Sequence, residues 1–199
     1  MVGLPIERLR RVWLIGLMAA AYILYSISVF CQDREAVIWN VLRSGGHVAL
    51  LRHAIAPGVG DPPGFTIGNC STQRNLSPAG RAQSKRIGEL LRTNGIRKAR
   101  VFSSQWCRCL DTARLLDLGP VQELPILNSF FQRDGQERSQ TEALRKWLTE
   151  QNLDEPLVLV THQVNITALT GVYPTSGELV VIRPSESDRI SVVGTVKTD

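Results

Sequence analysis

The sequence predicts an α/β fold: a three-layer α/β/α sandwich with a mostly parallel central sheet, preceded by an N-terminal hydrophobic helix. Three observations predict it. Short apolar runs alternate with amphipathic stretches along the body of the chain, the order typical of a parallel sheet covered by helices. At 43% hydrophobic residues, the 199-residue chain has enough apolar side chains for a buried core. A long uncharged run precedes the alternating part.

The uncharged run covers residues 12–31 and follows three arginines. As a helix it would be about 30 Å long, the thickness of the hydrocarbon core of a bilayer. Basic residues before it predict a cytoplasmic N-terminus and an exported body. A cleaved signal peptide is the alternative, since Ser26 and Ser28 fit a cleavage site. We therefore expect residues 1–32 to be a membrane anchor or signal peptide. Residues 33–199 would form one domain, held at the membrane outside the cytoplasm or released into the periplasm.

The charge of the chain is moderate and dispersed. The net charge is +5, and no run of five or more lysines and arginines occurs. Aromatic and basic residues do not alternate in the way that is typical of a nucleic-acid groove. The sequence therefore predicts no nucleic-acid partner, and the positive charge favours anionic small molecules or an anionic surface.

Three cysteines lie in the predicted domain: Cys70, Cys107 and Cys109. In an exported chain the oxidising compartment favours pairing, and Cys70 can pair with Cys107 or with Cys109. The close spacing of Cys107 and Cys109 also occurs in metal sites, but a structural zinc site needs about four ligands, usually as two separated pairs. The sequence therefore predicts one disulfide and no metal site.

The first half of the domain predicts a helix, a strand, a loop and a second helix. Apolar residues at helical spacing predict a short helix over residues 35–43 that ends at a glycine pair. Residues 47–53, HVALLRH, are an apolar run typical of a buried strand. Residues 56–69 are dense in glycine and proline and predict an irregular loop. Ser77 is an N-cap followed by proline, which predicts a helix up to Thr93.

The second half of the domain continues the alternation. Apolar residues at helical spacing predict its helices, and short apolar runs predict its strands. In chain order, the predicted elements are a strand at 99–103, a helix capped by Ser104, a short strand or extended link at 121–127, a helix at 141–152, a strand at 156–161, a short helix at 165–170, and strands at 178–182 and 190–196.

Polar side chains follow three of the predicted strands. Arg52 and His53 close the first strand, Ser104 follows the second, and His162 follows a later one. The helix after the second strand carries Arg108 on its first turn. Ligands bind at the carboxyl ends of the strands in such sheets. We therefore expect the two histidines and the two arginines to share one pocket.

A pocket of this composition suits a phosphoryl dianion. Two guanidiniums can bind its oxygens through charge-assisted hydrogen bonds, and the N–H groups at a helix start add partial positive charge. A guanidinium beside an imidazole raises the cost of protonating the ring, so Arg52 keeps His53 neutral and nucleophilic near pH 7. One imidazole can attack phosphorus while the other donates a hydrogen bond to the transferring group.

Four motifs, in order, resemble those of the histidine phosphatase (phosphoglycerate-mutase-like) superfamily. The family has an RHG-type motif after the first strand, L-[ST]-x-x-G-x-x-Q at the next helix, SS-x-x-x-R-x-x-x-TA after that, and a histidine that closes a late hydrophobic strand. The matching stretches are Arg52-His53-Ala54, LSPAGRAQ at 76–83, SSQWCRCLDTA at 103–113 and VLVTH at 158–162. The resemblance covers residues 46–183.

The resemblance implies a metal-independent phosphohydrolase that cleaves a phosphate monoester or a phosphohistidine. His53 would be the nucleophile that becomes phosphohistidine, and His162 would stabilise the transferring phosphoryl group. Arg52, Arg108, His162 and Gln163 would bind the phosphate. The resemblance implies no metal and no organic cofactor. The implied partner is a small phosphorylated substrate or a phosphoprotein.

The sequence departs from the family pattern in two ways. Ala54 replaces the commoner glycine. Many relatives have an acidic residue shortly after the third strand, where this chain reads LPILNSFF. Glu123 is the nearest candidate for the proton donor, with Asp134 and Asp61 behind it.

Three alternatives to hydrolysis remain. The missing acid favours a catalytically inactive phosphate- or anion-binding protein on the same fold, whereas the intact His53 and His162 argue against it. A mutase usually needs a larger lid than the short insertion after the first strand. A thiol-redox role for Cys107 and Cys109 lacks the C-x-x-C motif. We therefore prefer hydrolysis.

Overall fold

The computed structural model describes residues 35–133, 135–185 and 189–198. The chain separates into two units, Met1–Val37 and Ile38–Asp199. The predicted membrane anchor or signal peptide, residues 1–32, lies outside the described residues. Within the described part of the chain, no helix combines the length and the apolar composition that a membrane crossing requires.

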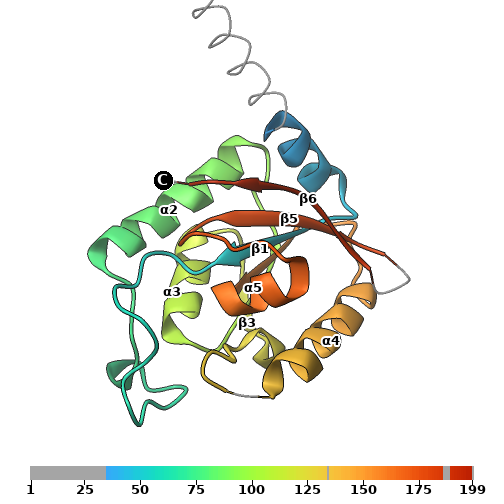
Figure 1. Cartoon of the computed structure of the whole chain (residues 1–199). Coiled ribbons are helices and arrows are strands. Elements are labelled where there is room, and N and C mark those ends of the chain that lie inside the picture. Colours follow the sequence, from blue (N-terminus) through green and yellow to red (C-terminus); the bar gives the residue numbers. More distant parts are fainter. Residues whose placement is uncertain (1–34, 134, 186–188, 199) are drawn as a thin grey trace, which may run out of the picture. The chain divides into compact units, whose positions relative to one another are not determined.

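The second unit is built on one six-stranded sheet (Figure 1). The spatial order of the strands is β3-β2-β4-β1-β5-β6; the first four are parallel, and β5 is antiparallel to both β1 and β6. The prediction of an α/β fold with a mostly parallel sheet is confirmed. The strands are β1 (Val48–Arg52), β2 (Arg100–Ser103), β3 (Val121–Glu123), β4 (Leu157–Thr161), β5 (Leu179–Pro184) and β6 (Ile190–Val196).

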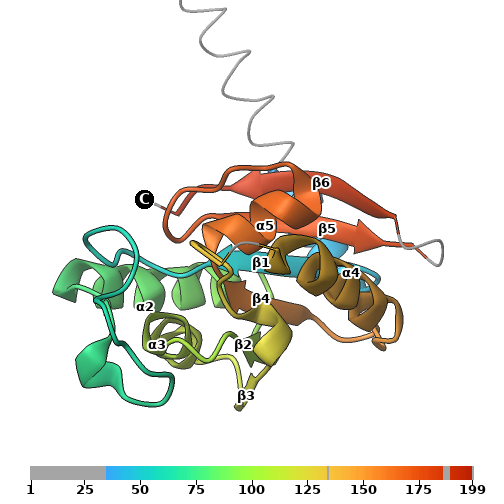
Figure 2. The same ribbon diagram turned by 60° about the horizontal axis from the view of Figure 1, so that its bottom comes forward.

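Helices cover both faces of this sheet (Figure 2). Buried side chains of α2 and α3 pack on one face, and those of α4 and α5 pack on the other, which gives the three predicted layers. Residues 35–44 are also helical. The remaining helices are α2 (Pro78–Thr93), α3 (Cys107–Leu116), α4 (Gln136–Thr149) and α5 (Gln163–Thr170), with short 3-10 helices η1 (Cys70–Thr72) and η2 (Pro125–Leu127).

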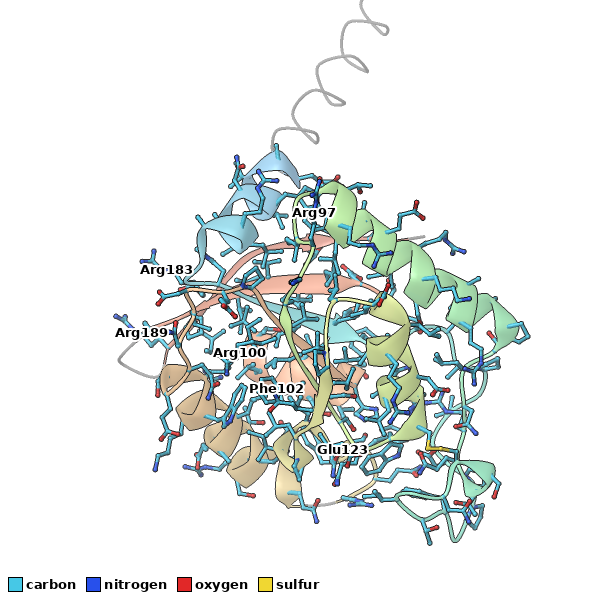
Figure 3. All side chains as sticks on the ribbon, turned by 180° about the vertical axis from the view of Figure 1, so that it is seen from behind. Arg97, Arg100, Phe102, Glu123, Arg183 and Arg189 are labelled. Atoms are coloured by element: carbon cyan, nitrogen blue, oxygen red, sulfur yellow. A yellow bond between two sulfur atoms is a disulfide. The ribbon has the colours of Figure 1, made fainter. Side chains whose placement is uncertain are left out.

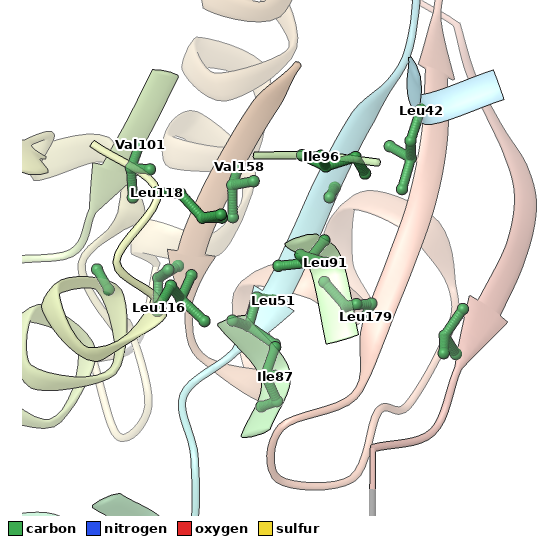
Figure 4. Close-up of a cluster of buried hydrophobic side chains, with 14 of the residues drawn as sticks. Leu42, Leu51, Ile87, Leu91, Ile96, Val101, Leu116, Leu118, Val158 and Leu179 are labelled. Carbon is green, nitrogen blue, oxygen red and sulfur yellow. The ribbon is translucent and has the colours of Figure 1, made fainter. Parts of the chain in front are cut away.

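Alternate residues of the central strands face opposite layers. In β1, Ala49 and Leu51 pack with α2 and α3, whereas Val48 and Leu50 pack with α4 and α5. Figure 4 shows the first of these clusters, in which Leu51 lies beside Ile87 of α2. Strands buried on both faces need apolar residues at every position. The continuous apolar runs of the sequence therefore predicted β1 and β4 correctly.

Two elements differ most from the prediction. Helix α4 begins at Gln136 rather than at 141, and its buried residues are Leu144 and Leu148, so its first turns lack the apolar spacing that marks a helix. The predicted extended run 121–127 is strand β3 followed by η2, which begins at Pro125. Proline has no N–H for a sheet ladder, so the strand ends before it.

One disulfide joins the glycine- and proline-rich loop to α3. Cys70 of η1 is bonded to Cys107, the first residue of α3, and Cys109 is free and buried. This is one of the two predicted pairings. Gln73 strengthens the junction because its Oε1 accepts a hydrogen bond from the backbone N–H of Cys107 at 2.9 Å. The loop is thereby held beside Arg108, the next residue of the helix.

Candidate active site

The ends of two adjacent strands bring two histidines together. Strands β1 and β4 are parallel, with Arg52 opposite Thr161, so His53 and His162 leave the sheet side by side. Their ring centroids lie 5.5 Å apart, and each residue is 3% exposed. Arg108 is equally buried and lies against His162. The structure therefore brings the ends of β1 and β4 together with the first turn of α3, as the sequence predicted.

These side chains line a cavity of about 230 Å³. The lining combines basic and polar groups from the strand ends with aromatic and apolar groups from the loops. It includes every residue predicted to be catalytic or phosphate-binding. The described lining residues are Arg52, His53, Gly58, Val59, Gly60, Asp61, Phe65, Arg74, Trp106, Arg108, Ser129, Phe131, Gln132, Arg133, His162, Gln163, Val164 and Tyr173.

His53 is held as a neutral ring whose Nε2 keeps its lone pair. Nδ1 lies 2.8 Å from the carbonyl oxygen of Ala54, which only accepts, so Nδ1 carries the proton. Burial lowers the pKa of His53 to about 3, and the positive charge of Arg108 adds to the effect. Arg52, the neighbour in sequence, lowers this pKa less than either. The main cause of the neutral ring is therefore burial rather than the adjacent arginine.

His162 has the opposite tautomer. Arg108 Nη2 lies 3.4 Å from Nδ1, and an arginine only donates, so the proton of this ring is on Nε2. Nε2 donates to Ser104 Oγ at 2.9 Å. Ser104 thus orients this ring, and the predicted N-cap role was wrong because the N-cap of α3 is Trp106. Burial, followed by the charge of Arg108, holds the pKa of His162 well below its ordinary value.

Arg108 forms a buried ion pair with Asp61. Its Nη1 and Nη2 lie 2.8 and 3.1 Å from the two carboxylate oxygens, and the side chains are 3% and 7% exposed. Trp106 Nε1 donates to the same carboxylate at 3.0 Å. Burial alone would raise the pKa of Asp61, but the hydrogen bonds from Arg108 and from the Arg74 backbone outweigh it and lower that pKa. Asp61 therefore stays ionised and is not a proton donor near neutral pH.

Two arginines present unpaired donors in this region. The Nε atoms of Arg52 and Arg108 are buried and have no hydrogen-bond partner among the described residues. Both arginines line the cavity, where their positive charge favours an anion. Arg74 is a third arginine of the lining, held by a 2.6 Å hydrogen bond from Nε to the carbonyl oxygen of Gly60. The prediction omitted Arg74, because a lone arginine in an irregular loop gives no periodic signal.

The other candidate proton donors are not brought to the cavity. Glu123 is exposed at the end of β3 (Figure 3), where it accepts a hydrogen bond from Gln105 Nε2 at 3.2 Å. It does not line the cavity. Asp134 lies outside the described residues. Among the residues that are described, no group of three or more His, Cys, Asp or Glu side chains is placed to hold a metal ion.

The second family-like motif supports the chain directly after His53. Ser77 caps α2, because its Oγ accepts a hydrogen bond from the Gly80 N–H at 3.0 Å. A β-carbon on Gly80 would lie 2.1 Å from the carbonyl oxygen of Ile55, so this close approach requires glycine. Gln83 Oε1 accepts a hydrogen bond from the Ile55 N–H at 3.1 Å. The motif is a scaffold that fixes the segment following the candidate nucleophile.

The free energy of unfolding is expected to fall as the pH drops below about 6.5. Histidines of the unfolded chain take up protons near this pH, whereas folded His53 stays neutral down to its pKa of about 3. The unfolded state binds more protons in this interval, so stability decreases by up to about 1.4 kcal/mol per pH unit for each such histidine. Urea unfolding between about pH 7 and about pH 4.5 measures the slope. In His53→Asn, the number of protons taken up on unfolding, which sets the slope, should fall by about one. An identical slope in this variant would contradict the prediction.

Comparisons with known proteins identify the fold. No family model and no curated protein matches the chain. A structure of the protein histidine phosphatase SixA complexed with tungstate is 17% identical, with a TM-score of 0.57 over 76% of this chain and 97% of that chain. A mycobacterial glucosyl-3-phosphoglycerate phosphatase is 17% identical, with a TM-score of 0.53 over 73% and 96%. A phosphoserine phosphatase from Entamoeba histolytica, in complex with 3-phosphoglyceric acid, is 14% identical, with a TM-score of 0.56 over 77% and 98%. The chain shares the fold of these phosphatases.

Proposed function

We propose that this protein is a metal-independent phosphohydrolase that cleaves a phosphate monoester or a phosphohistidine through a phosphohistidine intermediate on His53. The observation that carries the proposal is the composition of the cavity. Two neutral imidazoles, with ring centroids 5.5 Å apart, lie beside two guanidiniums whose Nε groups are unpaired. The fold shared with solved phosphatases supports the same activity.

In the first step, Nε2 of His53 attacks phosphorus. The N–P bond forms as the bond between phosphorus and the leaving group breaks, and the electron pair departs with the leaving group. Arg52 and Arg108 bind the non-bridging oxygens and neutralise their charge. The negative charge of the entering dianion favours the uptake of a proton from solvent on Nδ1 of His162. The protonated Nδ1 then donates a hydrogen bond to the transferring group.

In the second step, water attacks the phosphohistidine. The new O–P bond forms, the N–P bond breaks, and its electron pair returns to Nε2. The proton of the water passes to solvent, and orthophosphate leaves. Because burial keeps the pKa of His53 at about 3, the released ring stays neutral and is ready for the next turnover.

Phosphate release without metal tests this function. The purified full-length protein should release phosphate from p-nitrophenyl phosphate, and EDTA should leave the rate unchanged, because arginines supply the positive charge that a metal would otherwise provide. A colorimetric phosphate assay over a panel of phosphate esters measures it.

A negative result in this assay has a specific meaning. A protein that binds tungstate or phosphate but turns over neither an ester nor a phosphohistidine peptide would be an anion-binding protein on the same fold. The ionised Asp61 favours that second function, because the cavity then lacks a carboxylic acid to protonate a leaving group.

A further inference from the structure

Three apolar side chains stand exposed around the opening of the cavity. Val59, Phe131 and Tyr173 are 86%, 42% and 73% exposed, and all three line the cavity. Among the described residues, Val59 and Tyr173 are the most exposed large hydrophobic side chains. Exposed apolar groups that gather at one opening indicate a ligand with apolar surface. These three residues are termed the apolar rim.

The apolar rim is connected to the phosphate-binding side of the cavity. A β-carbon on Gly60 would lie 3.8 Å from Cε1 of Phe131, so the loop that carries Val59 meets this ring. Tyr173 precedes Pro174, whose carbonyl oxygen accepts a hydrogen bond from Arg52 Nη1 at 2.8 Å. A group attached to a phosphate that is bound by the arginines would therefore reach the rim.

Aromatic surface continues from the opening toward the histidines. The rings of Phe65 and Trp106 both line the cavity, with centroids 5.5 Å apart. Trp106 in turn meets the ring of His162, with centroids 5.4 Å apart in an edge-to-face arrangement. Trp106 is 1% exposed and the guanidinium of Arg133 lies over its ring at 5.4 Å, so the aromatic surface that this wall offers to a ligand is that of half-buried Phe65, which can stack on a planar group. The wall of the cavity therefore suits a planar ring.

The same cavity offers little help to a poor leaving group. Asp61 is the only carboxylic acid among the described lining residues, and its lowered pKa keeps it ionised. An alkoxide leaving group needs a proton from a positioned acid, which contributes about 10²–10⁴ in rate. A phenol ionises near pH 10, about six units below water. A phenolate therefore departs with much less assistance.

We infer that the substrate is a phosphate monoester of a phenol. Its ring lies against the apolar rim while its phosphate enters the cavity between Arg52 and Arg108. The inference rests on the proposed function and specifies its substrate class. Two independent features carry it: an exposed apolar surface continuous with the cavity, and a described lining whose one carboxylate is ion-paired with Arg108.

The chemical step balances without a protein acid. As the bond from phosphorus to Nε2 of His53 forms, the bond from phosphorus to the aryl oxygen breaks, and that oxygen takes the electron pair. The phenolate leaves past the apolar rim and takes its proton from water. The phosphohistidine is then hydrolysed as described above.

Three substrates separate ring recognition from leaving-group chemistry. 1-Naphthyl phosphate has an aromatic leaving group, acetyl phosphate has an acidic leaving group without a ring, and glycerol 3-phosphate has neither. In the native full-length protein, kcat/KM for glycerol 3-phosphate should be at least about a hundredfold below that for 1-naphthyl phosphate. In the double variant Phe131→Ser/Tyr173→Ser, the ratio of kcat/KM for 1-naphthyl phosphate to that for acetyl phosphate should fall at least about tenfold.

A matched control removes an exposed apolar side chain elsewhere. Val192 is 40% exposed on β6 and does not line the cavity, so Val192→Ser should keep the native ratio. An unchanged ratio in the double variant would overturn the inference, and so would equal kcat/KM for glycerol 3-phosphate and 1-naphthyl phosphate. Turnover of none of the three compounds, and of no phosphohistidine peptide, would overturn the proposed function itself, which is a distinct result.

Discussion

Replacing His53 by alanine is expected to lower the rate of phosphate release by more than about 10³-fold. The substitution removes the lone pair of Nε2, while the arginines that bind the phosphate remain. The measurement is kcat/KM for one phosphate ester in the native protein and in the variant. His47→Ala is the matched control, because His47 bonds to the Gly45 carbonyl oxygen at 2.8 Å and does not line the cavity.

The covalent intermediate gives a second readout of the same substitution. Rapid quenching of the native protein should trap a phosphoenzyme that survives alkali and decays in acid, as a nitrogen-bound phosphoryl group does. His53→Ala should trap none, yet it should still bind tungstate. A rate for His53→Ala within about tenfold of the native rate would place the nucleophile on another residue.

The positions of the histidines could be predicted because they depend on strands rather than on loops. Strands β1 and β4 are buried on both faces, so their apolar runs stand out in the sequence. Once both strands belong to one parallel sheet, their carboxyl ends meet at one edge. His53 and His162 directly follow those ends, so their proximity follows from the chain order and the fold.

The partners of Arg108 could not be predicted in the same way. Asp61 and Arg74 lie in an irregular loop, where neither a period of two nor a helical period relates a residue to the fold. Their places depend on the disulfide and on contacts made only after folding. The sequence therefore predicts Asp61 only as a possible proton donor, whereas in the structure Asp61 is ion-paired with Arg108, which lowers the pKa of its carboxyl group.

The cause of the neutral charge state of His53 could also be predicted only in part from the sequence. The adjacent Arg52 predicted the direction of the pKa shift, but burial and Arg108 contribute more to it. Burial results from the packing of the loop, α3 and the sheet around the ring. Local sequence therefore predicted a neutral imidazole, but from Arg52 alone, which contributes least to the lowered pKa.

Replacing Arg108 by methionine is expected to destabilise the protein by about 3 kcal/mol, because it leaves the buried Asp61 carboxylate without its charged partner. The side chains of this pair are 3% and 7% exposed, so water offers the orphaned carboxylate little compensation. Urea unfolding near neutral pH measures the change. Arg114→Met, on the exposed side of the same helix, should stay within about 0.5 kcal/mol of the native protein. Equal stability of Arg108→Met and native protein would show that the ion pair does not hold the loop.

Adding Asp61→Asn to Arg108→Met separates the structural role of the arginine from its catalytic role. The neutral amide needs no counter-charge and can still accept the hydrogen bond from Trp106 Nε1, so the double variant should recover much of the lost stability. Phosphate release should not recover, because the positive charge of Arg108 is still missing from the cavity. If activity returned together with stability, Arg108 would serve only to hold Asp61 and its loop in place. The arginine is assigned both roles because its Nη atoms bind Asp61 and its side chain also lines the cavity.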